Sequence, residues 1–228
     1  ILQDPQTSLN PVFNIGNQLG ESLSIARKDD RKGLASRAVD ALRKVNVAAP
    51  DRRLEDFPHQ MSGGMKQRVV GAIAMSCEPS VIIADEPTTA LDVTIQLQYL
   101  RLLKDIQAET GLAIIFITHD FGVVARMCDR VAVMYAGRIV EEGSVRDIFN
   151  NPSHPYTEAL IQSVPKLEEK VERLYSIEGQ PPLLSNLPDG CRFADRCPHA
   201  KEMCTTDYPD PFNISEGHTA NCWRLDSS

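Results

Sequence analysis

The sequence lacks three features that would each assign it to a class of protein. No apolar run approaches the ~20 residues that a membrane-spanning helix needs. Positive charge is not in excess, because 24 Lys and Arg stand against 31 Asp and Glu and the net charge is −7, so we expect no nucleic-acid partner. No charged segment followed by an apolar one, the pattern of a secretion signal, opens the sequence. We therefore expect any membrane role to come through a partner protein.

The composition is that of a globular protein, and it changes near residue 150. A hydrophobic fraction of 42% over 228 residues excludes a disordered chain and suits one large domain with an appendage. Segments of helix and strand character alternate in the first part, which predicts an α/β domain over residues 1–149 with a helical part at about 8–78. From 150 to 228, repeated prolines break a segment with little periodicity, and we expect a separate extension there.

The most informative stretch runs from Val81 to Asp92. Residues 81–84 form a short apolar run without alternation, typical of a strand buried on both faces of a parallel sheet. Asp85 and Glu86 follow at the carboxyl end of that strand, where open α/β sheets bind ligands. Asp85 is placed to hold Mg²⁺, and Glu86 is placed to meet a water molecule beside a phosphate. The plainer alternative is a strand that ends in a solvated acidic turn.

Periodicity and turn residues also predict the neighbouring elements. They are helices at 62–77 and 94–109, a strand at 113–117, and a hairpin that pairs 131–135 with 138–142. Gly111 is expected to end the second helix, and the strand at 113–117 leads into Thr118-His119-Asp120. Strands that alternate with helices in this order predict a parallel central sheet.

Ser62-Gly63-Gly64-Met65 is the second informative stretch, because it opens a predicted helix. A helix amino terminus presents free N–H groups and the positive end of the dipole, which together bind an anion such as phosphate. The serine hydroxyl adds a donor, and the glycines remove side chains that would block the approach. The alternative is a simple helix cap.

The order and spacing of these motifs resemble the ATPase subunit of ATP-binding-cassette (ABC) proteins over residues 1 to about 143. In that resemblance Gln3 is the Q-loop glutamine, Ser62-Gly63-Gly64-Met65 the signature sequence, Asp85 the Walker B aspartate, Glu86 the catalytic carboxylate, Asp92 the D-loop aspartate and His119 the switch histidine. Singly, His119 would be read as a structural histidine and Gln3 as a surface residue. The implied fold is a P-loop NTPase core with a helical signature subdomain.

Two departures from the family pattern matter. The signature usually reads Leu-Ser-Gly-Gly-Gln, whereas Met61 and Met65 stand here at its ends, as in the peptide-permease branch. The sequence also contains no G-x-x-x-x-G-K-[ST], the phosphate-binding loop that the family carries upstream of the Q-loop. We therefore expect a fold truncated at the amino terminus and a chain that is inactive without that loop.

The resemblance implies ATP and Mg²⁺ as cofactors and phosphoryl transfer to water as the chemistry. Asp85 and Gln3 would hold the metal, Glu86 would orient or deprotonate the attacking water, and His119 would contact the terminal phosphate. Ser62 and Gly64 would act on ATP bound to a second ATPase subunit.

Four of the six cysteines lie in the last 38 residues, namely Cys191, Cys197, Cys204 and Cys222. Four thiolates suit a [4Fe–4S] cluster or a tetrahedral Zn²⁺, and the wide spacing favours the cluster because zinc sites usually show closer pairs. Free or disulfide-linked thiols are the remaining alternative. Cys77 and Cys128 stand in apolar surroundings and are expected to be small core residues.

The tail from about 144 to 223 resembles the carboxy-terminal extension of dipeptide/oligopeptide permease ATPases, notably in Gly190-Cys191-Arg192-Phe193. This implies a peripheral protein at the cytoplasmic face of the cell membrane, which energises uptake of peptides, nickel or related solutes. Its partners would be a second ATPase subunit, two permease subunits and, indirectly, an extracytoplasmic solute-binding protein. The alternatives are a soluble ABC ATPase without a transport role and a non-hydrolysing, metal-binding regulatory fragment.

Overall fold

The computed structural model describes residues 1–26, 33–164 and 175–226, and its packing divides the chain into two units, Ile1–Asp120 and Phe121–Ser228. The change of composition near residue 150 falls inside the second unit, because the hairpin before it shares a sheet with strands of the tail. No helix in the described part of the chain is long and apolar enough to cross a membrane.

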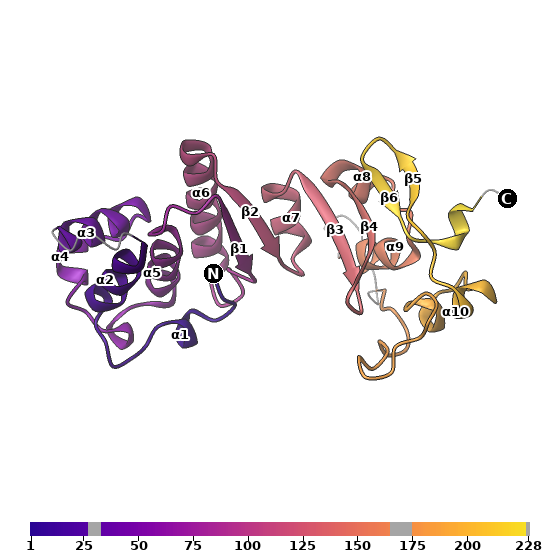
Figure 1. The fold of residues 1–228 in the computed structure, drawn as a ribbon, viewed down its shortest axis with the longest axis horizontal. Coiled ribbons are helices and arrows are strands. Elements are labelled where there is room, and N and C mark those ends of the chain that lie inside the picture. The colour runs from indigo at the N-terminus through magenta and orange to yellow at the C-terminus, as the bar shows by residue number, and fades with distance from the viewer. Residues whose placement is uncertain (27–32, 165–174, 227–228) are drawn as a thin grey trace. The chain divides into compact units, whose positions relative to one another are not determined.

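The first unit begins with a helical part (Figure 1). Its elements are α1 (Pro5–Ser8), α2 (Ile15–Ala26), α3 (Leu34–Lys44), α4 (Pro50–Arg53), a 3₁₀ turn (Pro58–Gln60) and α5 (Gly63–Met75). Apolar residues spaced four and three apart are buried, namely Ala38 and Leu42 on α3 and Val45 at its end, so α3 is an amphipathic helix. Pro50 starts the short α4, where its missing N–H costs no hydrogen bond.

A two-stranded parallel sheet and one long helix complete the first unit. Strand β1 (Val81–Asp85) pairs with β2 (Ala113–Ile117) from Val81–Ala113 to Asp85–Ile117, and α6 (Val93–Thr110) connects them. The predicted strands and helix are thus confirmed. Gly111 caps α6 with a φ of 70°, in the left-handed region that glycine adopts without strain.

The expectation that β1 is buried on both faces is wrong for the described residues. Ile82 and Ala84 are 4% and 0% exposed, whereas Val81 and Ile83 are 49% and 55% exposed. The same face continues on β2 with exposed isoleucines. One face of β1 is therefore buried, and the side chains of the other face are about half exposed.

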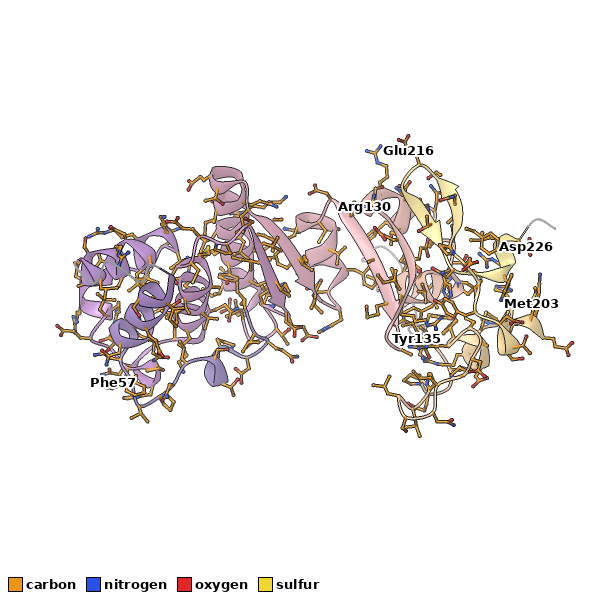
Figure 2. The ribbon with its side chains drawn as sticks, in the orientation of Figure 1. Phe57, Arg130, Tyr135, Met203, Glu216 and Asp226 are labelled. Atoms are coloured by element: carbon orange, nitrogen blue, oxygen red, sulfur yellow. The ribbon has the colours of Figure 1, made fainter. Side chains whose placement is uncertain are left out.

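The second unit is built on an antiparallel sheet in the order β3-β4-β6-β5. Its elements are α7 (Phe121–Met127), β3 (Arg130–Tyr135), β4 (Arg138–Ser144), α8 (Val145–Asn150), α9 (Pro155–Gln162), a 3₁₀ turn (Ala194–Arg196), α10 (Met203–Thr206), β5 (Phe212–Ser215), β6 (His218–Ala220) and a 3₁₀ turn (Trp223–Leu225). The predicted hairpin is confirmed as β3–β4. Tyr135, labelled in Figure 2, packs edge-on against Phe193 with ring centroids 5.2 Å apart.

A buried carboxylate joins β4 to the tail. Glu141 is fully buried and accepts hydrogen bonds from the backbone N–H groups of Ser153 at 2.8 Å and His154 at 2.9 Å. Nε2 of the buried His218, on β6, lies 2.8 Å from the same carboxylate. Because a buried charge is tolerated only when it is paired and hydrogen-bonded, this network fixes three separate segments against one another.

Candidate active site

The carboxyl ends of β1 and β2 bring the predicted acidic and imidazole side chains to one edge of the sheet. Asp85 is in register with Ile117, so Glu86 and His119 both follow directly after paired strand ends. The start of the chain runs beside β1, because the Asp85 N–H donates to the Ile1 carbonyl at 2.9 Å. This pairing brings Gln3 within hydrogen-bonding distance of the Glu86 carboxylate.

Glu86 is the centre of the site, since three side chains bond its carboxylate. Nε2 of Gln3 donates to Oε2 at 2.8 Å, the hydroxyl of Thr89 donates to the same oxygen at 3.0 Å, and Nδ1 of His119 lies 3.0 Å from Oε1. The bonds from His119, then Gln3, then Thr89 hold the pKa of Glu86 below its usual value. An ionised carboxylate is therefore favoured.

The backbone of Glu86 is held in an uncommon conformation. Its φ is 42°, in the left-handed region that costs a non-glycine residue free energy. Its N–H donates to the Ile117 carbonyl at 2.8 Å, and the Thr89 N–H returns to the Glu86 carbonyl at 3.3 Å. The end of β2 and a tight turn thus fix the direction of the carboxylate. Strain retained at such a position indicates a functional constraint.

His119 has room for a further contact. Its side chain is 75% exposed, whereas that of Glu86 is 22% exposed. With Nδ1 directed at Glu86, the exposed remainder of the ring is available to a ligand. The pair can hold a polarised water or a phosphate oxygen between protein groups and solvent.

The Ser62–Met65 stretch contacts the segment after Glu86. Ser62 is the N-cap of α5, and its hydroxyl accepts from the Met65 N–H at 3.4 Å, so the simple cap is present. A Cβ on Gly64 would stand 2.6 Å from Cγ2 of Ile95 on α6, which explains why glycine is needed there. Within the described residues no bond joins this stretch to Glu86, and its predicted phosphate contact stays a prediction.

Asp92 acts as a helix cap. Its Oδ1 accepts the N–H groups of Thr94 and Ile95, each at 3.0 Å, at the start of α6. A carboxylate at a helix amino terminus is favoured by both the free N–H groups and the dipole. The family role of the D-loop aspartate is untested by these contacts.

Sequence reasoning missed Thr89. A threonine three residues after a carboxylate, across a turn that contains proline, is a pattern in which the hydroxyl can return to the acid. That signal was available in Glu86-Pro87-Thr88-Thr89.

The oxygen donors present fit a magnesium ion. Asp85 supplies a carboxylate and Gln3 an amide oxygen, and the segments that carry them are paired at this sheet edge by the bond from the Asp85 N–H to the Ile1 carbonyl. Mg²⁺ prefers oxygen ligands and is usually held by one or two carboxylates together with substrate phosphates.

The four tail cysteines line one cavity of about 20 Å³, together with His154 and Phe193. Burial raises the pKa of Cys191, Cys197 and Cys222, and the Lys201 N–H donates to Sγ of Cys204 at 3.4 Å. Nevertheless, among the described residues no group of three or more His, Cys, Asp or Glu side chains could hold a metal ion as arranged. The predicted iron–sulfur cluster is thus not supported.

The other two cysteines are less buried than expected. Cys77 is exposed, and Cys128 is half-buried. The prediction that Cys77 is a core residue is wrong because it follows the end of α5, where the chain leaves the packed part of the unit.

Two family models match the chain. The model described as "ABC transporter" matches residues 3–89, and the model described as "Oligopeptide/dipeptide transporter, C-terminal region" matches residues 140–204. The first range contains Gln3, the Ser62–Met65 stretch, Asp85 and Glu86. The second contains three of the four tail cysteines.

Proteins of similar sequence are named as dipeptide or oligopeptide transport ATP-binding proteins. The chain is 50% identical over 226 residues to the dipeptide transport ATP-binding protein DppD of Bacillus subtilis (strain 168), covering 99% of this chain and 68% of that protein. It is 47% identical over 223 residues to the oligopeptide transport ATP-binding protein AppD of the same organism, covering 98% and 68%.

Solved structures give the same fold. The structure of cbiO1 from Clostridium perfringens, part of the ABC transporter complex cbiONQ, has a TM-score of 0.57 at 30% identity over 65% of this chain and 57% of that chain. The ATP-binding cassette MJ0796, a dimer in a post-hydrolysis state bound to ADP and Pi, has a TM-score of 0.55 at 29% identity over 62% and 60%. The chain thus spans about 60% of these solved cassettes.

Proposed function

The chain belongs to the ATP-binding subunits of ABC transporters, in the oligopeptide/dipeptide family, and on this premise we propose that it hydrolyses ATP to drive uptake of di- or oligopeptides or of related solutes such as nickel. The observation that carries the proposal is the convergence of Gln3, Thr89 and His119 on the carboxylate of Glu86. The match of the tail to the peptide-transporter region favours an importer over a soluble ABC ATPase without a transport role.

The chemistry proposed for Glu86 is that of a base for water. The water oxygen forms a bond to the terminal phosphorus of ATP while the bond from that phosphorus to the bridging oxygen breaks, giving ADP and inorganic phosphate. Glu86 accepts a hydrogen bond, and then the proton, from that water. His119 holds the carboxylate from one side and contacts the terminal phosphate with its exposed ring. Bound Mg²⁺ would neutralise phosphate charge, with Asp85 and Gln3 as its proposed protein ligands.

We propose that the phosphate-binding loop is supplied by a segment outside these 228 residues. The motif is absent from the sequence, and parallel sheets are covered on both faces, yet one face of β1 and β2 is exposed. The side chains of that face are Val81, Ile83, Ile115 and Ile117, each 49–55% exposed. A cassette segment packed on this face would cover the apolar surface and bring the loop to the edge where Glu86 lies.

The arrangement of Ser62–Met65 and Glu86 in this chain suggests the proposed partners. In the part of the chain that the structure describes, no hydrogen bond joins the Ser62–Met65 stretch to Glu86 of the same chain, which suits a signature that acts on ATP bound to a second ATPase subunit. Two permease subunits and an extracytoplasmic solute-binding protein would complete the importer, with this chain at the cytoplasmic face of the membrane.

The test of the hydrolytic role is Glu86→Gln in the complete transporter. We expect steady-state ATP turnover to be lost while ATP binding remains, because the amide keeps the shape of the side chain but cannot take a proton. Gln107→Glu, a change of the same size on α6 away from the site, is the control and should leave turnover intact. Undiminished turnover in Glu86→Gln would remove Glu86 from the catalytic role.

For the tail we propose a metal centre held by the four cysteines, a [4Fe–4S] cluster in preference to Zn²⁺. The support is that four thiols separated by up to 31 residues line the same cavity, and the spacing is wide for a zinc site. A cavity of about 20 Å³ has room for roughly one water-sized sphere, so the thiols must move apart to admit four irons.

Elemental analysis of an anaerobic preparation tests the metal proposal without any activity measurement. Four equivalents of iron with inorganic sulfide, lost in Cys197→Ser, support the cluster. One zinc and no iron would replace the cluster by Zn²⁺, and neither metal would leave the cysteines as free thiols.

A further inference from the structure

Thr89 differs from the two other donors to Glu86 in how it is held. Gln3 lies on an irregular segment at the start of the chain, and the His119 side chain is 75% exposed. Thr89 is instead three residues from Glu86 in the same turn, and its own N–H donates to the Glu86 carbonyl at 3.3 Å. Its hydroxyl therefore reaches Oε2 at 3.0 Å from a position fixed by the backbone.

Gln3 and His119, the other two donors, each have a second role in the proposed function, whereas Thr89 has none. In the proposed function Gln3 also coordinates Mg²⁺ and His119 also contacts the terminal phosphate, so both must adjust when nucleotide arrives. Thr89 has no such second task. It is the donor whose bond to Glu86 does not depend on the position of the nucleotide.

We propose that Thr89 is a positioning residue for hydrolysis, which holds Oε2 of Glu86 so that the carboxylate keeps its direction toward the attacking water through the catalytic cycle. This inference rests on the proposed role of Glu86 as the base. Thr89 itself touches neither water nor phosphate in the reaction. It acts by restricting the rotation of the carboxylate, and a misdirected base is less effective even when it is ionised.

Thr89→Val in the complete transporter tests the proposal. We expect kcat for ATP to fall about tenfold with KM unchanged, because one bond to a charged group is lost while nucleotide contacts remain. Thr89→Ser, which keeps a hydroxyl, should restore kcat. The backbone bond of the turn survives in both variants.

Thr88→Val is the matched control, one residue away and with the same change of hydroxyl to methyl. It should leave kcat unchanged, and equal thermal melting of all three variants would show that folding is intact. The proposal is overturned if Thr89→Val has a normal kcat, or if Thr88→Val lowers kcat as much as Thr89→Val does. Failure of the hydrolytic role is a separate result, because it would show as turnover in Glu86→Gln.

Discussion

Gly64 and Ile95 are in such close contact that a Cβ on the glycine would stand 2.6 Å from Cγ2 of the isoleucine. This contact joins the first turn of α5 to the first turn of α6. The sequence suggested that Gly64 leaves room for a phosphate, and the structure adds that it leaves room for α6. The segment that carries the signature and the helix that follows Glu86 therefore pack directly against each other.

Gly64→Ala should disturb the packing of α5 against α6. A Cβ at 2.6 Å forces Ile95 or the helices to move, and overpacking of this kind costs about 1–3 kcal/mol in the free energy of unfolding. We expect a lower midpoint in urea unfolding and reduced ATP turnover in the assembled transporter.

Gly20→Ala is the control for that variant. Gly20 also lies in a helix, α2, but a Cβ there would meet no atom within 4 Å. Alanine should then stabilise the helix by about 0.5–1 kcal/mol through its higher propensity. If Gly64→Ala proved as stable as Gly20→Ala, the contact between α5 and α6 would not require glycine at residue 64.

Helices and strands whose sequence signals lie within their own segment were predicted correctly. The strand at 113–117 and the hairpin were predicted correctly because apolar runs and turn residues lie within the segment that they specify. The convergence of Gln3 and His119 on Glu86 was anticipated only through the family resemblance, since it depends on the pairing of distant segments. Thr89 was missed because a hydroxyl three residues after a carboxylate can also point to solvent, so the local pattern does not by itself fix its partner.

Other features depend on packing that no local pattern reports. The exposed face of β1 was predicted to be buried, because an apolar run does not say whether both covering layers are in the same chain segment. The partners of Glu141 come from Ser153, His154 and His218, and the sequence gives no sign that these residues meet. Long-range polar networks of this kind become visible only in the folded chain.

Glu141→Gln should destabilise the second unit strongly. The carboxylate accepts three donors while fully buried, and an amide would place an N–H₂ group against one of them. The expected loss is about 3 kcal/mol, the range found when one partner of a buried charged network is removed. Urea unfolding measures it, and faster proteolysis of the tail should accompany it.

Glu142→Gln supplies the matched control, since the neighbouring side chain points the other way along β4. Glu142 pairs with Arg130 at 2.7 Å on the surface, where both side chains are about half exposed. A pair of this kind contributes less than about 1 kcal/mol. Similar unfolding midpoints for the two variants would refute a structural role for the buried network.

His154 makes the stability of the second unit dependent on pH. Burial lowers the pKa of His154 from 6.5 to about 4, because the charged ring is poorly solvated there. The folded chain therefore binds this proton less readily than the unfolded chain, so the contribution to stability is full above pH 6.5 and is lost as the pH falls toward 4. The loss amounts to about 3 kcal/mol, and urea unfolding at pH 7.5 and pH 5 should show a large part of it.

His154→Asn separates this titration from the structural role of the residue. His154 caps α9, with Nδ1 accepting the Tyr156 N–H at 3.0 Å, and asparagine is also a good N-cap. The variant should keep the helix yet lose much of the pH dependence between 7.5 and 5. His199→Asn, which removes an exposed histidine from the same unit, should leave that dependence unchanged. An unaltered pH dependence in His154→Asn would contradict the assignment of the effect to this ring.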